Sequence, residues 1–246
     1  MTQFATPPES APIPPAKPPS RPVLRGRTVT LVPLQPSHAS PLFPILNNDK
    51  PEQKALWAYM PEGPYNDLAH LEKDLSAKSA SADPLFFAIL DNNNDSRDDD
   101  LSGRPVGYIA LMSIFADHRR LEIGHVTFSK LLQRTTGATE AVFLLLKYSF
   151  DVLGFRRVEW KCNNLNEGSK RAALRFGFQY EGLFRQHMVV KGANRDTAWF
   201  SILDREWGVV KEGLETWLKE ENFDAEGKQV RSLDEIRGDI QARVKE

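Results

Sequence analysis

Two stretches decide the fold: LEIGHVTFSKLLQRTTGATEA at residues 121–141 and RVEWKCNNLNEGSKRAALRFGFQYEGLFR at residues 157–185. In the first stretch, Leu121–Ser129 has the composition of a strand. Gly137–Leu153 is apolar almost all round, which indicates a buried helix. The first stretch therefore predicts a strand, a loop of small residues and a helix in succession.

The second stretch predicts another strand followed by another helix. Arg157–Cys162 favours a strand, and Asn166–Phe176 favours a helix for which Asn166 is a natural N-cap. Gly177 is expected to end this helix, because glycine readily adopts the left-handed conformation that closes many helices.

The flanking sequence predicts further strands and helices around this centre. The expected strands are Thr28–Leu34, Leu85–Leu90, Val106–Phe115, Leu183–Val190 and Thr197–Leu203, and the expected helices are Ser37–Asn47, Asn66–Ser79 and Glu206–Lys219. One mixed sheet covered by helices on both faces satisfies this order as a single α/β (α+β) domain.

The two ends of the chain differ from this centre. Eight of the 17 prolines lie in the first 22 residues, so we expect residues 1–23 to form a Pro-rich disordered arm. The domain proper is expected at residues 24–220, followed by a charged C-terminal extension at residues 221–246. The polar run DNNNDSRDDDLSG at residues 91–103 predicts a solvated loop between two strands.

Composition excludes several classes of protein. The net charge of -1 offers no basic excess for a nucleic-acid backbone. The single cysteine, Cys162, excludes an internal disulfide and a cysteine zinc cluster, and the five histidines show no metal-ligand spacing, so no metal is expected. No apolar run is long enough to span a membrane, and the first residues lack the apolar core of a secretory signal, so a cytoplasmic protein is expected.

The loop before the first central helix suits a phosphate group. The first turn of a helix carries unpaired amide donors and partial positive charge. Residues 134–138 would supply such backbone donors, and their small side chains would leave these donors accessible. The side chains of Gln133 and Arg134 could add a polar and a positively charged contact to the phosphate. Neither a P-loop nor a dinucleotide fingerprint nor a nucleophile elbow is present.

These motifs together resemble the GNAT family of acetyl-CoA-dependent N-acetyltransferases. The family's phosphate-binding loop, [QR]-x-x-G-x-[GA], corresponds to residues 133–138, where Thr136 replaces the central glycine. The later elements Asn166-x-x-Ser169, Gly177-Phe178 and Glu181-Gly182 also match. The chain is most similar to the branch that contains ribosomal-protein N-terminal acetyltransferases.

The resemblance implies a fold, a co-substrate and a coenzyme site. The fold is a single GNAT-like domain with a mixed central sheet of about seven strands and helices on both faces. The co-substrate is acetyl-CoA, without a metal. The coenzyme-binding residues that it implies are Phe128, Gln133, Arg134, Thr135, Thr136, Gly137, Ala138, Thr139 and Asn166.

The implied reaction is attack of an amine on a thioester, which requires a base because an alkylamine with a pKa of about 10.4 is protonated at neutral pH. Glu122, eleven residues before Gln133, matches the catalytic glutamate of several family members. A structural, salt-bridged glutamate is the alternative, and proton transfer through water remains open. Many members use a tyrosine as the acid, but that position is Ala173, so Ser169 is the expected catalytic substitute. Asn166, also expected in the catalytic group, would bond the pantetheine chain while it opens the helix, and simple capping is the alternative.

The acceptor site is expected between the first helices and the last hairpin. Aromatic faces and a carboxylate suit a protonated amine, and the candidate substrate residues are Trp57, Tyr59, Tyr65, Asp196 and Trp199. Core packing is the competing interpretation of each aromatic residue.

Three functions remain open from the sequence. The first is acetylation of a small-molecule primary amine, the second is acetylation of a protein or peptide N-terminus, and the third is CoA binding without catalysis. The expected partner is therefore an amine or a peptide N-terminus, with neither nucleic acid nor membrane, and the chain is expected to be a monomer or homodimer.

Overall fold

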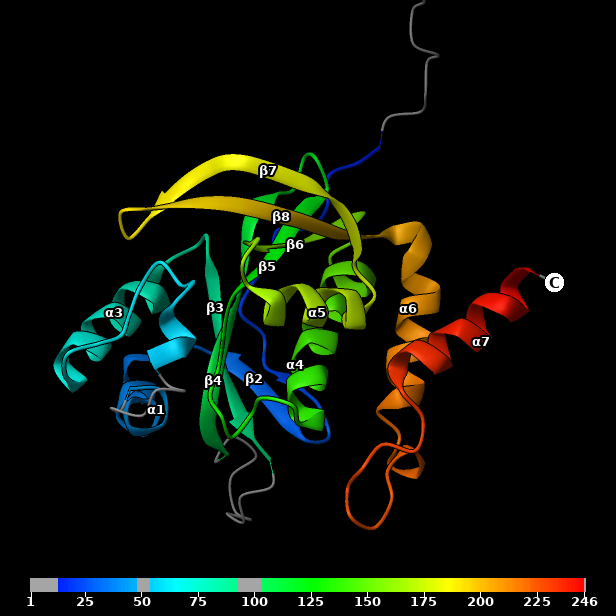
Figure 1. The fold of residues 1–246 in the computed structure, drawn as a ribbon, viewed down its shortest axis with the longest axis horizontal. Helices are drawn as coiled ribbons and strands as arrows, with labels where there is room; N and C mark the ends of the chain where they lie inside the picture. The colour runs from blue at the N-terminus through cyan, green and yellow to red at the C-terminus, as the bar shows by residue number, and fades with distance from the viewer. Residues whose placement is uncertain (1–12, 48–53, 93–102, 246) are drawn as a thin grey trace, which may run out of the picture.

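A computed structural model describes residues 13–47, 54–92 and 103–245 of the chain. The described strands form one sheet in the order β1-β2-β3-β4-β5-β6-β8-β7 (Figure 1). The strands are β1 Leu24–Arg25, β2 Val29–Pro33, β3 Leu85–Asp91, β4 Arg104–Phe115, β5 Arg120–Phe128, β6 Arg157–Asn163, β7 Gln179–Val190 and β8 Ala193–Leu203. The described sheet has eight strands where about seven were expected. The additional strand, β1, has two residues, which is too short to produce a recognisable sequence pattern. The first twelve residues of the expected arm and most of the expected loop at 91–103 lie outside the described residues.

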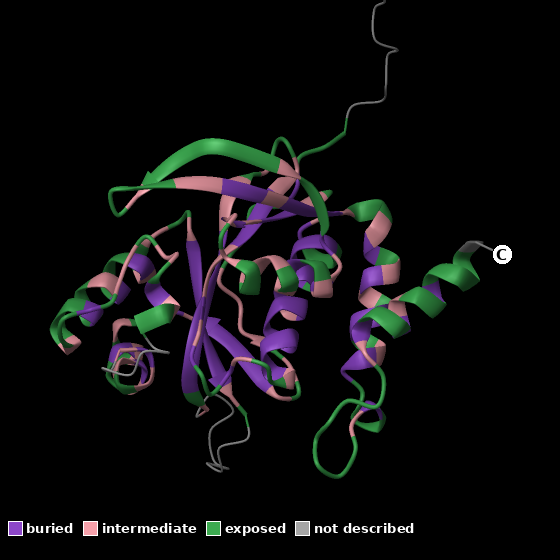
Figure 2. Cartoon of the chain, viewed as in Figure 1, coloured by how far each residue is buried: buried purple, intermediate pink, exposed green. Residues whose placement is uncertain are grey.

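Helices cover both faces of the sheet, as expected (Figure 1). The side chains of β3 and β4 are buried on both faces, which explains their almost continuous apolar sequence (Figure 2). One face packs against α1 Ala39–Leu46 and α3 Leu68–Ala80. The other packs against α4 Thr136–Lys147 and α6 Asp204–Trp217.

Helix α4 is tied to the sheet by a buried carboxylate. Glu140 accepts hydrogen bonds from the backbone nitrogens of Arg27 (2.8 Å), Thr28 (2.6 Å) and Val29 (3.1 Å), which fixes the start of β2 against the helix. The helix is shorter than expected: after Lys147 the chain forms a π-helical turn, Tyr148–Val152. Both segments are largely buried, so apolar periodicity could not distinguish them.

Helix α5, Glu167–Phe176, begins and ends as the sequence predicts. The side chain of Asn166 accepts a hydrogen bond from Ser169 N (3.1 Å), and Gly177 adopts a left-handed φ of 100°. Helix α3 begins at Leu68, just after its N-cap Asp67, whose side chain accepts from His70 N (2.7 Å). Local capping chemistry therefore sets these boundaries.

The last hairpin is longer than the sequence indicated, since β7 begins at Gln179 and β8 at Ala193. Much of β7 is exposed, so its outer residues carry no apolar alternation (Figure 2). The hairpin arches toward α3, and Lys191 at its tip donates to the carbonyl oxygens of Trp57 (3.0 Å), Glu62 (2.9 Å) and Gly63 (2.6 Å) (Figure 1).

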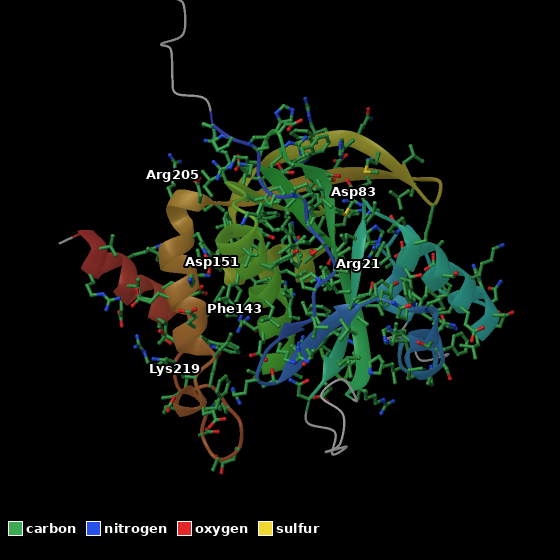
Figure 3. All side chains as sticks on the ribbon, turned by 180° about the vertical axis from the view of Figure 1, so that it is seen from behind. Arg21, Asp83, Phe143, Asp151, Arg205 and Lys219 are labelled. Atoms are coloured by element: carbon green, nitrogen blue, oxygen red, sulfur yellow. The ribbon has the colours of Figure 1, made fainter. Side chains whose placement is uncertain are left out.

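Both ends of the described chain pack more closely than expected. Residues 13–23 were expected in a disordered arm, but Ala16 is buried and its amide donates to Ala116 O (3.0 Å). Lys17 N likewise donates to Leu153 O (2.8 Å), because the residues between the prolines keep their amide donors. Figure 3, seen from behind, shows the segment around Arg21 crossing the back of the sheet.

The charged C-terminal extension forms a second ordered addition. Helix α7, Leu233–Lys245, follows a loop after α6 and buries Leu233, Ile236 and Ile240 in the main core. Three apolar residues along one face therefore attach a helix whose remaining residues are mostly charged or polar. Among the described residues, no helix combines the length and apolarity that crossing a membrane requires.

Candidate active site

A cavity of about 1400 Å³ opens where two parallel strands separate. Strands β5 and β6 pair only from Arg120–Arg157 to Glu122–Glu159, and beyond that point they diverge. The edge of β5 that faces the gap therefore has backbone amides and carbonyls outside the ladder, available to a ligand. The cavity lies between these strands, the N-terminus of α4, helix α5 and the loops above them.

The cavity is strongly cationic although the whole chain is nearly neutral. Among the described residues, its lining contains one carboxylate, that of Glu122. The cationic side chains of the lining are Lys130, Arg134, Lys161, Arg171, Arg175, Arg195 and Lys228. Such a lining attracts a polyanion.

The start of α4 is built as the sequence predicted. Thr135 caps the helix, because its side chain accepts from Ala138 N (3.3 Å). Gln133 donates to Phe128 O (2.8 Å), which fastens the loop to the end of β5. Of the predicted coenzyme residues, those lining the cavity are Phe128, Gln133, Arg134, Thr135, Thr136, Ala138, Thr139 and Asn166.

Gly137 is the predicted coenzyme residue that does not line the cavity. A Cβ atom on Gly137 would lie 2.8 Å from Val29 Cγ1 and 3.3 Å from Leu132 Cδ1. Glycine at this position therefore allows close packing of α4 against β2. The predicted coenzyme contact of Gly137 stays a prediction, and it concerns the backbone amide in the first turn of α4.

Ser169 lies beside the predicted capping residue at the start of α5. Its hydroxyl accepts a hydrogen bond from Trp160 Nε1 (2.9 Å), which leaves the hydroxyl hydrogen available to a ligand. Asn166, whose Oδ1 caps the helix, has no described acceptor for its Nδ2 group. Cys162 also lines the cavity, and burial raises the pKa of its thiol.

Glu122 lines the cavity at the point where the strands diverge. Its carboxylate accepts from Lys161 Nζ (2.9 Å) and Ser113 Oγ (3.3 Å). Burial raises the pKa of Glu122 above the ordinary glutamate range, although the ion pair with Lys161 opposes the shift. The site therefore combines a reachable carboxylate with an increased proton affinity, as a general base requires.

The carboxylate next to it is held differently. Glu159 accepts from Arg157 Nε (2.8 Å) and pairs with Lys161 (2.9 Å). Burial opposes the effect, but these cations lower the pKa of Glu159. Glu122 and Glu159 thus share Lys161, but the pKa of Glu122 is raised and the pKa of Glu159 is lowered.

Two of the predicted substrate residues belong to the core. Trp57 is buried and donates from Nε1 to Leu46 O (3.0 Å). Tyr65 is buried edge-on against Trp57 and donates to Asp74 Oδ2 (2.5 Å). The prediction that they contact an acceptor is wrong, because both side chains are used to anchor the loop between α1 and α3.

The two predicted hairpin residues also lie outside the cavity lining. Asp196 accepts from Gln186 N (2.7 Å) and Asn194 Nδ2 (3.0 Å), so it stabilises the hairpin. Trp199 presents its ring to Lys161 Nζ, 4.1 Å from the centroid, and so binds an internal cation rather than an amine substrate. Tyr59 is the predicted acceptor residue that does line the cavity, and its hydroxyl donates to Leu165 O (3.1 Å).

The acceptor end of the cavity combines apolar side chains with His125, His187 and Arg195. Met60, Met112 and Met188 line it from three separate segments. The bonds of Lys191 and Tyr59 join the hairpin and Leu165, just before α5, to residues 57–63 at this end.

Sequence reasoning missed a histidine at this end. His125 lines the cavity in a left-handed conformation (φ 47°) at an irregularity between β4 and β5. Its Nδ1 lies 3.1 Å from Glu62 Oε1. Burial opposes the effect, but His125 and Lys78 hold the pKa of Glu62 at about 2. No local pattern signals a partner 63 residues away.

The described residues contain no cluster of His, Cys, Asp and Glu side chains suited to a metal ion. CoA, in contrast, fits the donor set. The cations of the lining and the first-turn amides of α4 match its phosphates, and the free edge of β5 matches its amide-containing arm.

Known proteins are similar to this chain in sequence and in fold. The model of the acetyltransferase (GNAT) domain matches residues 28–179. A GCN5-related N-acetyltransferase from Brucella melitensis superposes with a TM-score of 0.85 at 44% identity, covering 92% of this chain and 98% of that chain. A GNAT-family protein from Chromobacterium violaceum superposes with a TM-score of 0.72 at 38% identity, covering 85% of this chain and 99% of that chain.

Curated relatives are similar to this chain over a shorter stretch of sequence. YdaF of Bacillus subtilis, which carries the name of a ribosomal N-acetyltransferase, is 32% identical over 105 residues, 43% of this chain. The match spans 57% of that relative, so the chain covers little more than half its length. The expected family and its mixed-sheet fold are confirmed by the domain match and by the Brucella structure. The chain belongs to the GNAT family of acetyltransferases.

Proposed function

We propose that the chain transfers an acetyl group from acetyl-CoA to the primary amine of a small molecule by direct attack. One observation supports this proposal: a single cavity runs from a cationic end at α4 and α5, past Glu122, to an end under the hairpin that three methionines line. The coenzyme, when bound, supplies the acetyl thioester. The residues that would hold its phosphates are Arg134, Thr135, Thr136, Ala138 and Thr139.

Glu122 takes the proton from the incoming amine, directly or through a water molecule. Its raised pKa brings its proton affinity closer to that of the amine. Lys161 donates to Oε2 of Glu122, which fixes the orientation of the carboxylate. The positive charge of Lys161 also favours the ionised form of Glu122 before the reaction. The backbone amides on the free edge of β5 stabilise the negative charge that develops on the carbonyl oxygen.

Ser169 donates a hydrogen bond from its hydroxyl to the departing thiolate, which afterwards takes a proton from solvent. The Ser169 oxygen accepts from Trp160 Nε1, so its hydrogen can be donated either to the Cys162 thiol or to a ligand in the cavity. Ser169 thereby substitutes for the acid that Ala173, a fully buried residue without a polar group, cannot provide. Asn166 donates from Nδ2 to the arm of the coenzyme while its Oδ1 caps α5.

The hydrogen bonds that span the hairpin end of the cavity support a small acceptor. Lys191 and Tyr59 bridge segments that would have to separate to admit a folded polypeptide. The three methionines favour an amine that carries an apolar group. A cytoplasmic location and a monomeric or homodimeric state stay predictions.

A peptide N-terminus is the second candidate acceptor. The similarity to YdaF, named as a ribosomal N-acetyltransferase, favours it. A chain terminus is also a primary amine, and only its first residues would have to enter the cavity.

Release of the CoA thiol from acetyl-CoA, measured against a panel of small apolar amines and of short peptides, tests the proposal. We expect turnover with small amines that falls sharply for peptides, and its loss in Glu122→Gln. Turnover with peptides alone would replace the first candidate by the second. Tight CoA binding without turnover on any acceptor would support the third function, a non-catalytic CoA-binding module, and would contradict both.

A further inference from the structure

The C-terminal extension contributes to the cavity although it lies outside the family domain at residues 28–179. We call residues 220–232, between α6 and α7, the C-terminal loop. Phe223, Gly227, Lys228 and Gln229 of this loop line the same cavity as the start of α4. The extension therefore adds a wall to the cationic end rather than a separate appendage.

The C-terminal loop is held in a defined conformation. Asn222 donates to Trp217 O (3.2 Å) and Arg231 O (3.1 Å) and accepts from Arg231 N (3.0 Å). Trp217 Nε1 donates to Gln229 Oε1 (2.9 Å), which fastens the loop to the end of α6. Each bond joins the loop to itself or to α6, so the loop presents a fixed surface to the cavity.

Arg175 of α5 contacts both α4 and Trp217, the residue to which the loop is fastened. Its guanidinium sits 4.6 Å from the ring centroid of Trp217 and donates to Thr139 Oγ1 (2.9 Å). Among the described residues, no carboxylate oxygen lies within 4.0 Å of Arg175 or of Lys228 Nζ. Both cations line the cavity, and neither forms an ion pair at that distance. Burial lowers the pKa of Arg175, the charge of Asp234 opposes this shift, and the charge of Arg237 adds to it.

We propose that Arg175 and Lys228 form a subsite for the 3′-phosphate of CoA, with the C-terminal loop as its outer wall. The inference rests on the proposed function. The diphosphate of the coenzyme is assigned to the first-turn amides of α4, so the remaining phosphate needs separate cations farther from Glu122. Arg175 reaches past the first turn to Thr139. Lys228 lines the same cavity and is the chain neighbour of Gln229, which bonds the Trp217 ring that Arg175 faces. A phosphate between two such cations forms charge-assisted hydrogen bonds with both.

Calorimetric titration with CoA and with 3′-dephospho-CoA tests the subsite, because the two ligands differ only in this phosphate. We expect the full-length protein to bind CoA roughly 10-fold or more tightly than dephospho-CoA, which is the range of one charge-assisted contact. Lys228→Gln should reduce this ratio to about 2 while leaving the affinity for dephospho-CoA nearly unchanged.

Lys219→Gln is the matched control. Lys219 is an exposed lysine just after α6, outside the cavity lining (Figure 3). Its variant should keep the wild-type ratio. Equal binding of both ligands by the wild type, or an unchanged ratio in Lys228→Gln, would overturn the subsite and leave the proposed function intact. Binding of neither ligand would overturn the subsite and the proposed function together.

Discussion

The two ends of the cavity differ in how the sequence builds them. The coenzyme end comes from short contiguous segments, the loop and first turn of α4 and the first turn of α5, where capping and small residues leave a local signature. The acceptor end is assembled from residues 55–61, strand β4 and the β7–β8 hairpin. Local motifs therefore identify the coenzyme end, whereas only the folded chain identifies the acceptor end.

The largest expected effect lies where the two ends meet. Glu122→Gln should lower kcat by about 10²–10³-fold, because it removes the base, while the affinity for CoA stays within about twofold. The rate of the wild type should fall as the pH falls through the raised pKa of Glu122, since only the carboxylate accepts a proton. A pH profile of kcat for both proteins measures this, and the acidic limb should be absent in the variant.

Glu159→Gln distinguishes a catalytic role of Glu122 from a structural role of the ion pairs that Lys161 forms with Glu122 and Glu159. Glu159 shares Lys161 with Glu122 but does not line the cavity. This variant should retain the acidic limb and lose less than about tenfold in kcat. Equal losses in both variants would mean that Glu122 has only a structural role.

The coenzyme end is tested by Thr136→Asp. A carboxylate at the first position of α4 is favourable for the helix by up to about 1 kcal/mol but repels a phosphate at the same amides. We expect the Kd for CoA to rise about 100-fold, because like charges roughly 4 Å apart repel by a few kcal/mol at a partly buried site. The melting temperature should not fall, and the isosteric Thr136→Asn should bind CoA nearly normally. Unchanged affinity in the aspartate variant would place the phosphates elsewhere.

Ser169→Ala should have a smaller effect on the chemical step. We expect kcat to fall roughly 10-fold, which corresponds to one hydrogen bond of about 1.4 kcal/mol to the departing sulfur. The variant also leaves Trp160 Nε1 without its acceptor, so stability should fall by about 1–3 kcal/mol. Ser169→Thr, which keeps the hydroxyl, should recover kcat, and a wild-type kcat in Ser169→Ala would remove the residue from the mechanism.

The acceptor end should respond through KM. Lys191→Met removes three bonds to the loop carbonyls of residues 57–63, so the KM for the amine should rise about fivefold while the Kd for CoA stays constant. Asp196→Asn should leave both constants within about twofold, because Asp196 lies outside the cavity lining. A change in the Kd for CoA with a constant KM for the amine would contradict the assignment of the two ends.

Most of the fold follows from local sequence, with errors of a few residues at the element ends. Asn166, Asp67 and Gly177 set helix boundaries that could be predicted, because a cap and its partner are three or four residues apart. The site residues divide in the same way. Thr135 and Ser169 could be placed from their motifs, whereas Trp57 and Trp199 could not, since an aromatic residue has the same signature in a core and in a pocket.

The features that the sequence did not predict have a common physical cause. Gly137 matches the motif position, but its contact with Val29 depends on how α4 packs on β2. Lys228 enters the cavity from a segment 89 positions after Thr139, and the His125–Glu62 pair joins residues 63 positions apart. Such contacts depend on tertiary packing, which a single sequence does not encode in any short pattern.

Calorimetric titration of CoA into the folded, full-length protein tests the central claim most directly. The cationic end at α4 and α5 predicts saturable one-to-one binding, with a Kd of about 1–100 μM that weakens as salt is added. A titration without binding heat, supported by an unchanged melting temperature at millimolar CoA, would contradict the claim that this cavity is a coenzyme site.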